Sequence, residues 1–359
     1  MTAGQPTLYP PTLADISASK SMGMRRAVIV CLTAFVAVAC GGTGASTTSA
    51  GSEDGEGTPT TAAPGERDFV TFALGDLIRV NPDDGSSTQL ASIEGEVFAI
   101  TAGGGSVWLA RADGSVVRIS PSSGEVEADI DTGVSEQAID VAYTEGAVWT
   151  LHGIPGIATT MAMIDPAGNV AHHVVTVPEG GTFSAITAGE GAGWAIGGNS
   201  EKVTILYRLD PSSGDIEEFD TGVIGTDVTT GGGFVWISGF GFPDGGEGVE
   251  GVGKFDPATG TTAIYAVGNS SQSVAFTPDG VWLGDPLGDG GAFVHRLDPA
   301  TGTTQASIAV GDAHSGSMPI YVGAGFVWVA SEGSLYVIDP AVNELAGEGD
   351  SPGGALLFP

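Results

Sequence analysis

Short apolar stretches interrupted by glycine recur along most of the chain and predict β-strands. Residues 97–101, 106–110, 115–120 and 125–131 show this in one copy of the pattern, as runs of strand length rich in branched residues. Glycines at 103–105 separate the first two runs, because glycine adopts the positive φ angles of a tight turn without a steric penalty. The pattern predicts four consecutive antiparallel strands.

Two markers repeat in step with these strands. Tryptophans fall in the second strand of successive copies, at Trp108, Trp149, Trp194, Trp236, Trp282 and Trp328. A residue followed by proline marks the turn after the third strand, at Asn81, Ser120, Asp165, Asp210, Asp256, Asp298 and Asp339. Repeats of about 40 to 50 residues with one tryptophan and one turn are typical of propeller blades. The sequence predicts an all-β fold, a seven-bladed β-propeller of four-stranded antiparallel blades.

The markers themselves have structural interpretations. An Asp before Pro accepts a backbone hydrogen bond and proline presets φ, so these carboxylates are expected to shape turns. The tryptophans are expected to fill the core between blades, because an indole buries a large apolar face. The short apolar runs interrupted by glycine exclude a helical solenoid. A β-sandwich with a second domain stays an alternative, although it would not explain the seven copies of the repeat.

The first copy lacks one strand. Residues 69–73 match a second strand and 76–81 a third, and no apolar run precedes them nearby. Residues 354–358 at the C-terminus match a first strand. We therefore expect this C-terminal strand to complete the first blade and close the ring, which removes the free sheet edges that favour aggregation.

The N-terminal region has the layout of an export signal. Arg25 and Arg26 precede an apolar run at 27–39, which is too short for a bilayer core that takes about 20 residues. Residues 1–39 are thus expected to be a signal peptide removed on export. The polar residues ahead of the basic pair add nothing to such a signal, so translation is expected to start at Met24 or Met22.

The junction of Ala39 with Cys40 resembles the lipobox of bacterial lipoproteins, which implies a lipid on Cys40. Ala37 stands where such boxes usually carry Leu, so simple secretion with cleavage after Ala39 stays open. Residues 41–67 contain no Val, Leu, Ile or Phe and predict, with Cys40, a disordered tether reaching roughly 30 Å. The domains expected are the signal (1–39), the lipidated tether (40–67) and the propeller (68–359), held at the outer side of the cell membrane.

The composition and net charge of the chain limit the kinds of molecule that it is expected to bind. The chain has 59 glycines and a formal net charge of −32, and such a field repels nucleic acid and favours cations or basic partners. Both cysteines lie among the first 40 residues, so the body is expected to have no disulfide. A monomer is expected.

Loops that vary in length point to one face as the binding surface. In a propeller the second-to-third loops and the blade connectors share a face, and most length variation of this chain falls there. The candidate binding residues on this face are His152, Phe240, Phe242, Asp244, Glu247, Asp285, Asp289 and His314. Their carboxylates would suit Ca²⁺, but no ordered calcium or zinc spacing is present, and no catalytic motif stands out, so no metal, cofactor or catalytic residue is assigned.

The repeat unit, a Val-Trp pair followed by an Asp-Pro turn, is clearest at 281–302 and 327–340. It resembles the bacterial seven-bladed propellers related to virginiamycin B lyase and the YVTN-type surface repeats, over residues 69–359. The resemblance leaves two functions. One is a non-enzymatic binding or scaffold lipoprotein for a protein, peptide or glycan, and the other is a metal-assisted lyase resembling streptogramin lyase, for which His152 and His314 are the only histidines placed suitably.

Overall fold

The computed structural model describes residues 69–73, 76–81, 87–177, 181–350 and 356–357, which all belong to one compact unit, residues 31–359. Consequently the expected signal at 1–39, the start at Met24 and the lipidated tether at 40–67 lie outside the described residues. Among the described residues, none forms a helix of the length and hydropathy that a membrane span needs.

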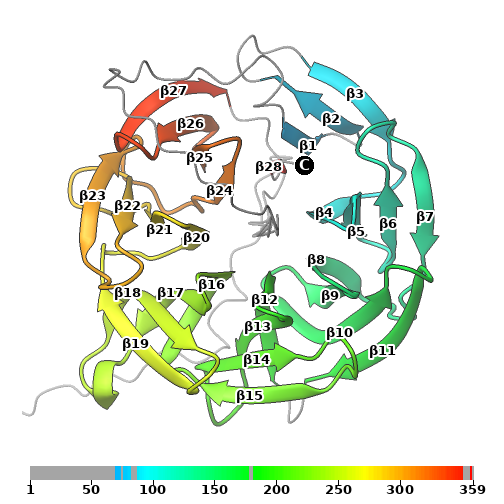
Figure 1. Ribbon diagram of the computed structural model, residues 1–359, viewed down its shortest axis with the longest axis horizontal. Helices are drawn as coiled ribbons and strands as arrows, with labels where there is room; N and C mark the ends of the chain where they lie inside the picture. The colour runs from blue at the N-terminus through cyan, green and yellow to red at the C-terminus, as the bar shows by residue number, and fades with distance from the viewer. Residues whose placement is uncertain (1–68, 74–75, 82–86, 178–180, 351–355, 358–359) are drawn as a thin grey trace, which may run out of the picture. The chain divides into compact units, whose positions relative to one another are not determined.

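The described strands form five separate four-stranded antiparallel sheets and one eight-stranded sheet, arranged around a ring (Figure 1). The first sheet, in the order β28-β1-β2-β3, comprises Leu356–Leu357, Phe69–Ala73, Asp76–Val80 and Ser87–Ser92. Strands β4 to β7 are Val97–Gly103, Ser106–Arg111, Val116–Ile119 and Val126–Ile130. Strands β16 to β19 are Val223–Gly231, Phe234–Gly241, Val249–Asp256 and Thr261–Ala266.

Two further sheets complete this set. Strands β20 to β23 are Ser273–Thr277, Gly280–Asp285, Phe293–Leu297 and Thr304–Ala309. Strands β24 to β27 are Ile320–Gly323, Phe326–Ser331, Ser334–Asp339 and Glu344–Asp350. A short 3₁₀ turn, η2 at Pro243–Gly245, lies between β17 and β18.

The eight-stranded sheet corrects the prediction of seven separate blades. It contains β8 to β11, at Gln137–Thr144, Ala147–Ile154, Ile157–Asp165 and Val170–Thr176. It also contains β12 to β15, at Thr182–Gly189, Ala192–Gly198, Ile205–Leu209 and Ile216–Asp220. The two groups join where β10 pairs with β12 at Ala158 and Phe183. Register shifts after both residues bend the strands, which explains why their backbones meet.

The apolar core lies between successive four-strand groups. One buried cluster combines Val70 and Leu77 with Leu109 and Val117 of the next sheet, and another combines Trp236 and Val252 with Leu283 of the following sheet. All six tryptophans are at most 1% exposed. Four of their indole N–H groups donate to the carbonyl five residues earlier, at the turn after the first strand. The prediction that tryptophans fill the core between sheets is confirmed.

The C-terminal strand closes the ring as predicted. Leu357 pairs with Val70 and Leu356 with Thr71, so β28 supplies the innermost strand of the first sheet. Phe69 also packs on Trp328 of the last sheet, with ring centroids 5.6 Å apart. The first and last strands of the described chain therefore both belong to the first sheet, and β1 also packs against the last sheet.

The Asp-Pro turns repeat one hydrogen-bond pattern. The carboxylates of Asp256 and Asp298 each accept the N–H two residues later at 2.8 Å, and Gly260 and Gly302 each donate back to the Asp carbonyl at 2.8 Å. Both glycines have φ near +70°, which closes the turn. These carboxylates are turn-forming groups, as the sequence predicted.

Candidate functional site

The strand order defines two faces of the ring. We call the turn face the one formed by the first-to-second and third-to-fourth turns. We call the loop face the one formed by the connectors between sheets and the second-to-third loops, which include residues 111–116, 154–157, 198–205, 241–249, 285–293 and 331–334. The candidate residues that sequence analysis selected lie in these loops and connectors or in the strand ends next to them.

Basic side chains on the third strands hold successive sheets together near the turn face. Arg79, Arg118, Lys254 and Arg296 each donate to a proline carbonyl in the next sheet's turn, at 2.6 to 2.7 Å. Three of these cations also lie over tryptophan rings, Arg118 over Trp108, Lys254 over Trp236 and Arg296 over Trp282. These cations therefore serve structural contacts that repeat around the ring.

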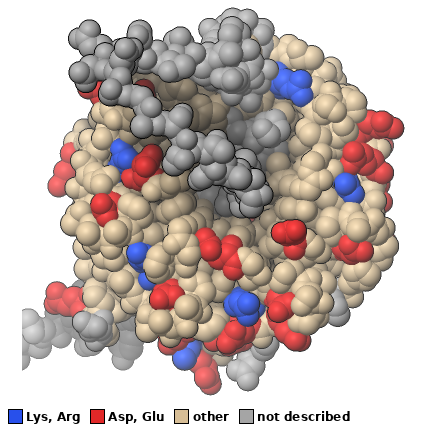
Figure 2. Space-filling view, in the orientation of Figure 1, with Lys and Arg blue, Asp and Glu red and all other residues tan. Residues whose placement is uncertain are grey.

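The remaining basic residues of the described chain are paired with carboxylates. Arg111 bonds Asp129 at 2.7 Å, Lys202 lies 3.2 Å from Asp220, and Arg208 lies 3.7 Å from Glu217. Figure 2 shows acidic side chains spread around one face, with few basic ones between them. Within the described residues, each Lys and Arg has a hydrogen-bond or ion-pair partner, so the surface acids dominate the field that a ligand meets.

His152 and His314 are buried and have both ring nitrogens engaged. The Nδ1–H of His152 donates to the Glu136 carbonyl at 3.2 Å, and Nε2 accepts from the Thr150 hydroxyl at 2.7 Å. Burial lowers the pKa of His152, although the Glu136 carbonyl opposes this. His314 accepts from the Gly316 N–H at 3.1 Å and donates from Nε2 to Ser331 at 2.7 Å. Contrary to our expectation, neither histidine is presented on the loop face for a ligand.

Asp285 is also buried, at 1% exposure, and its oxygens are used. It accepts the backbone N–H groups of Asn269 and Ser270, both at 3.0 Å, and lies 3.3 Å from His295 Nε2. The carboxylate thus fixes the connector before β20. Asp289 and Glu247 are exposed, whereas the side chain of Asp244 lies outside the described set.

Phe240 and Phe242 come together at the end of β17. Their rings meet edge to face with centroids 5.3 Å apart, and Phe240 keeps 36% of its surface exposed. Gly248 lies directly against the Phe240 ring, where a Cβ would overlap it. This pair is held in place yet remains accessible, as a binding aromatic must be.

Sequence analysis missed the aliphatic part of the loop face. Exposed apolar side chains occur there in four successive strand groups, at Ile154, Ile157, Val203, Ile224 and Leu287. Ile224 pairs across strands with Phe240. Single exposed apolar residues are common on protein surfaces, so the sequence alone did not mark these five, and periodicity gives no information on loop exposure.

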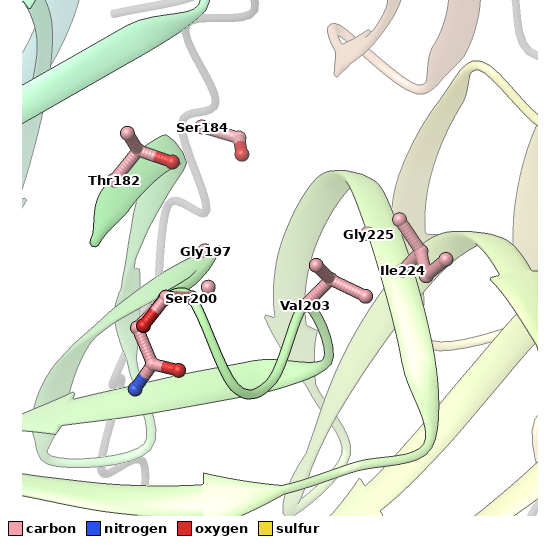
Figure 3. A pocket seen from close by; sticks show the side chains of 9 residues that line it. Thr182, Ser184, Gly197, Ser200, Val203, Ile224 and Gly225 are labelled. Atoms are coloured by element: carbon pink, nitrogen blue, oxygen red, sulfur yellow. The ribbon is translucent and has the colours of Figure 1, made fainter. Parts of the chain in front are cut away.

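A pocket of about 340 Å³ opens on this face between β12 and β16. Figure 3 shows Thr182 and Ser184 on one side and Val203 and Ile224 on the opposite side. Asn199 and Ser200 of the loop after β13 complete the lining, together with Gly197, Gly198 and Gly225. The lining contains no charged side chain.

Two buried carboxylates link inner strands away from this pocket. Asp140 on β8 accepts the Ile186 N–H of β12 at 3.1 Å, and Asp227 on β16 accepts the Val274 N–H of β20 at 2.9 Å. Burial raises the pKa of both carboxyl groups well above the usual Asp range, although the backbone N–H groups oppose it. Each carboxylate accepts a second N–H from the next residue of its own strand, so both act as connections between sheets.

The described residues contain no evident metal-binding site. No group of three or more His, Cys, Asp or Glu side chains lies close enough there to hold an ion. The calcium site considered from the sequence therefore stays a prediction without a set of ligands.

Comparison with known proteins supports the fold. No family model matches the chain, and no curated protein matches it. Solved structures with similar folds include the dihydro-heme d1 dehydrogenase NirN in complex with DHE, with 15% identity and a TM-score of 0.56 over 84% of this chain and 68% of that one. BamB from Moraxella catarrhalis has 12% identity and a TM-score of 0.51, over 79% and 87% of the two chains.

Hydrazine synthase of Kuenenia stuttgartiensis is a further similar structure, with 14% identity, a TM-score of 0.51, and 69% and 80% of the two chains covered. At such identities the likeness shows the fold alone, because one fold hosts many functions. The chain is a β-propeller with four-stranded blades, and the comparisons do not distinguish among groups of propellers.

Proposed function

We propose that this protein is an extracytoplasmic recognition module whose loop face binds a partner with an apolar, positively charged surface. The observation that carries the proposal is the set of exposed apolar side chains at Ile154, Ile157, Val203, Ile224, Phe240 and Leu287. Of the eleven large apolar side chains that are exposed among the described residues, these six lie at the loop face, and the other five lie in fourth strands or in a turn that leads to one. Exposed apolar patches mark interaction sites in soluble proteins. The acids between them favour a basic partner.

The path of the first strand supports an arrangement in which this face is free. Phe69 pairs with Val80 and Ala73 with Asp76, so β1 enters at the turn face and runs toward the loop face. Phe69, the first described residue, therefore lies on the side opposite the proposed binding surface. A lipid on Cys40 would hold the module at the membrane without covering its loop face.

We also propose that the ring works as seven blades of the kind seen in virginiamycin B lyase-like and YVTN-type propellers. In support, the inner strands β4, β8, β12, β16, β20, β24 and β28 contact one another in sequence around the ring. The described residues also form seven clusters of buried apolar side chains. On this proposal the eight-stranded sheet is two blades joined at Ala158. No observation favours the lyase alternative, since the ring nitrogens of His152 and His314 are occupied by structural hydrogen bonds.

Anchoring is tested with Cys40→Ser in the full-length gene. The wild-type protein is expected to fractionate with membranes and to gain the mass of a diacylglycerol unit, and the variant is expected to lose both properties. Equal membrane association of the two proteins would rule out anchoring through Cys40, and it would leave the loop-face proposal to its own test.

Binding is tested with the double variant Ile154→Ser and Leu287→Ser, which changes only exposed positions in two strand groups. Partners are cross-linked in intact cells and recovered through the full-length chain. The double variant is expected to lose most of the recovered partner, because a central apolar contact commonly contributes about tenfold or more in affinity. The matched control Val342→Ser changes an exposed apolar residue in the turn after β26. Equal losses in both variants would contradict the proposal.

A further inference from the structure

The pocket between β12 and β16 has two unlike walls. Thr182, Ser184, Asn199 and Ser200 provide hydroxyl and amide groups, whereas Val203 and Ile224 provide aliphatic surface on the other side (Figure 3). Gly197 and Gly225 leave no room for larger side chains, since a Cβ would strike Thr182 in the first case and Ile196 in the second. The walls are thus shaped by backbone and short side chains of β12, β13 and β16 and by the loop between β13 and β14.

The hydroxyls of the polar wall are free to meet a ligand. Within the described residues, those of Thr182, Ser184 and Ser200 have no hydrogen-bond partner. Thr226 gives a direct comparison, because it occupies the same register shift in β16 that Ser184 occupies in β12. Its hydroxyl donates to the Ser271 carbonyl at 2.7 Å and joins the next sheet. Ser184 holds the equivalent position without that structural contact.

Charge limits the class of ligand. No charged side chain lines the pocket, and Lys202 in the adjacent loop is paired with Asp220. An anion would meet no counter-charge there and would be repelled by the acidic surface, while a cation would lose hydration without a carboxylate to replace it. The pocket is suited to an uncharged molecule.

We propose that this pocket binds an uncharged saccharide. Hydroxyl groups that both donate and accept match the Thr182, Ser184 and Ser200 side chains, and the C–H face of a sugar ring matches Val203 and Ile224. The volume of about 340 Å³ falls at the small end of the range of ligand sites, which suits a short saccharide. This site shares Val203 and Ile224 with the proposed partner surface, but Thr182, Ser184 and Ser200 belong to the pocket alone, so sugar binding can be tested apart from partner binding.

The test measures sugar binding to the purified full-length chain by calorimetry and saturation-transfer NMR. The probes are maltose and N,N′-diacetylchitobiose, with glucosamine and glucose 6-phosphate as charged comparators. At least one neutral disaccharide is expected to bind saturably, and the charged sugars are expected to bind about tenfold more weakly or not at all. Because no protein partner is present, the result is independent of the cross-linking experiment.

Two variants locate the site. Ser184→Ala and Thr182→Val are each expected to weaken sugar affinity about three- to tenfold, as loss of one hydrogen bond does, with no fall in melting temperature. Ser122→Ala removes an exposed hydroxyl in a turn-face loop and is expected to leave affinity unchanged. No saturable binding of either neutral disaccharide at millimolar concentration overturns the proposal, as does binding that both pocket variants leave intact.

Discussion

The turn face and the loop face are built from the same four-strand repeat, but they use their polar groups differently. On the turn face, Asp256 and Asp298 close equivalent turns, and Lys254 and Arg296 donate to equivalent proline carbonyls. On the loop face, hydroxyls of the pocket lack partners and aliphatic side chains face solvent. The contacts of the turn face repeat and hold successive sheets together. The unpartnered hydroxyls and exposed aliphatic side chains of the loop face do not repeat, and other single features there, such as Asp285 and His314, are structural.

The largest effect on stability is expected where the ring closes. Deleting residues 351–359 removes β28 and leaves β1 with an open edge next to the Phe69 and Trp328 contact. We expect the melting temperature to fall by about 10 °C or more, or folding to fail, since several kcal/mol of packing and pairing is lost. Circular dichroism melting measures this. Deleting only residues 358–359 is the control, and an unchanged melt of the longer deletion would refute closure by β28.

The next largest loss of stability is expected from replacing a basic residue of the turn face, and it is compared with the loss from replacing one of the loop face. Arg296→Met removes the hydrogen bonds to Pro340, Asn343 and Asp279 and the contact with Trp282. It is expected to lower the free energy of unfolding by about 2 to 3 kcal/mol in urea titrations, because charged hydrogen bonds to partly buried groups are lost. Lys202→Met removes an exposed ion pair and is expected to cost less than about 1 kcal/mol. Equal losses in the free energy of unfolding would contradict the claim that basic residues of the turn face contribute more to stability than those of the loop face.

A smaller effect should appear as a pH dependence. Burial raises the pKa of Asp227 above that of the unfolded chain, so folding takes up a proton in the window between the two values. The free energy of unfolding contributed by this group therefore falls as the pH rises from about 4 through the raised pKa. Between about pH 5 and pH 8, the melting temperature of the wild type should fall more steeply than that of Asp227→Asn.

The control for this experiment is Asp210→Asn. Hydrogen bonds from the Ser212 hydroxyl and backbone lower the pKa of Asp210, so its favourable contribution is complete above the unfolded pKa and is lost only in more acid solution. Its melting curve should run parallel to the wild type over the same pH range. If Asp227→Asn also runs parallel, the buried carboxylate does not titrate as its environment indicates.

The smallest effect on stability is expected on the loop face. Leu287→Ser changes a side chain that is 48% exposed, so the free energy of unfolding should shift by about 0.5 kcal/mol or less. Urea titration measures this shift. A loss as large as that of Arg296→Met would show that Leu287 is a packing residue and would remove it from the recognition surface.

The repeated features of the fold were predictable from sequence, because each one rests on local chemistry. Trp236 and the Asp256 turn follow from indole burial and from turn preferences that act over a few residues. The joining of two groups at Ala158 and Phe183 was not predictable, since it depends on how two bent strands meet. For the same reason the pairing of β28 with β1 could be inferred only from a missing strand and a spare one.

The candidate site was predicted less well than the fold. The loop face was chosen from loop lengths, and Phe240 is exposed there. His152, Asp285 and His314 were chosen for their chemistry, but their side chains are buried and satisfied by hydrogen bonds. A sequence does not show which polar side chain turns inward, because partners such as Thr150 and Ser331 are brought close only by strand pairing and connector folding.

The most direct test of the account places a photo-cross-linking amino acid at Ile154 or Leu287 on the loop face, and at Ala258 or Ala300 on the turn face, in the full chain in living cells. Specific cross-linked products are expected from the two loop-face positions, with background yields from the two turn-face positions. Equal yields from both faces, or products from the turn face alone, would contradict the claim that the loop face is the recognition surface.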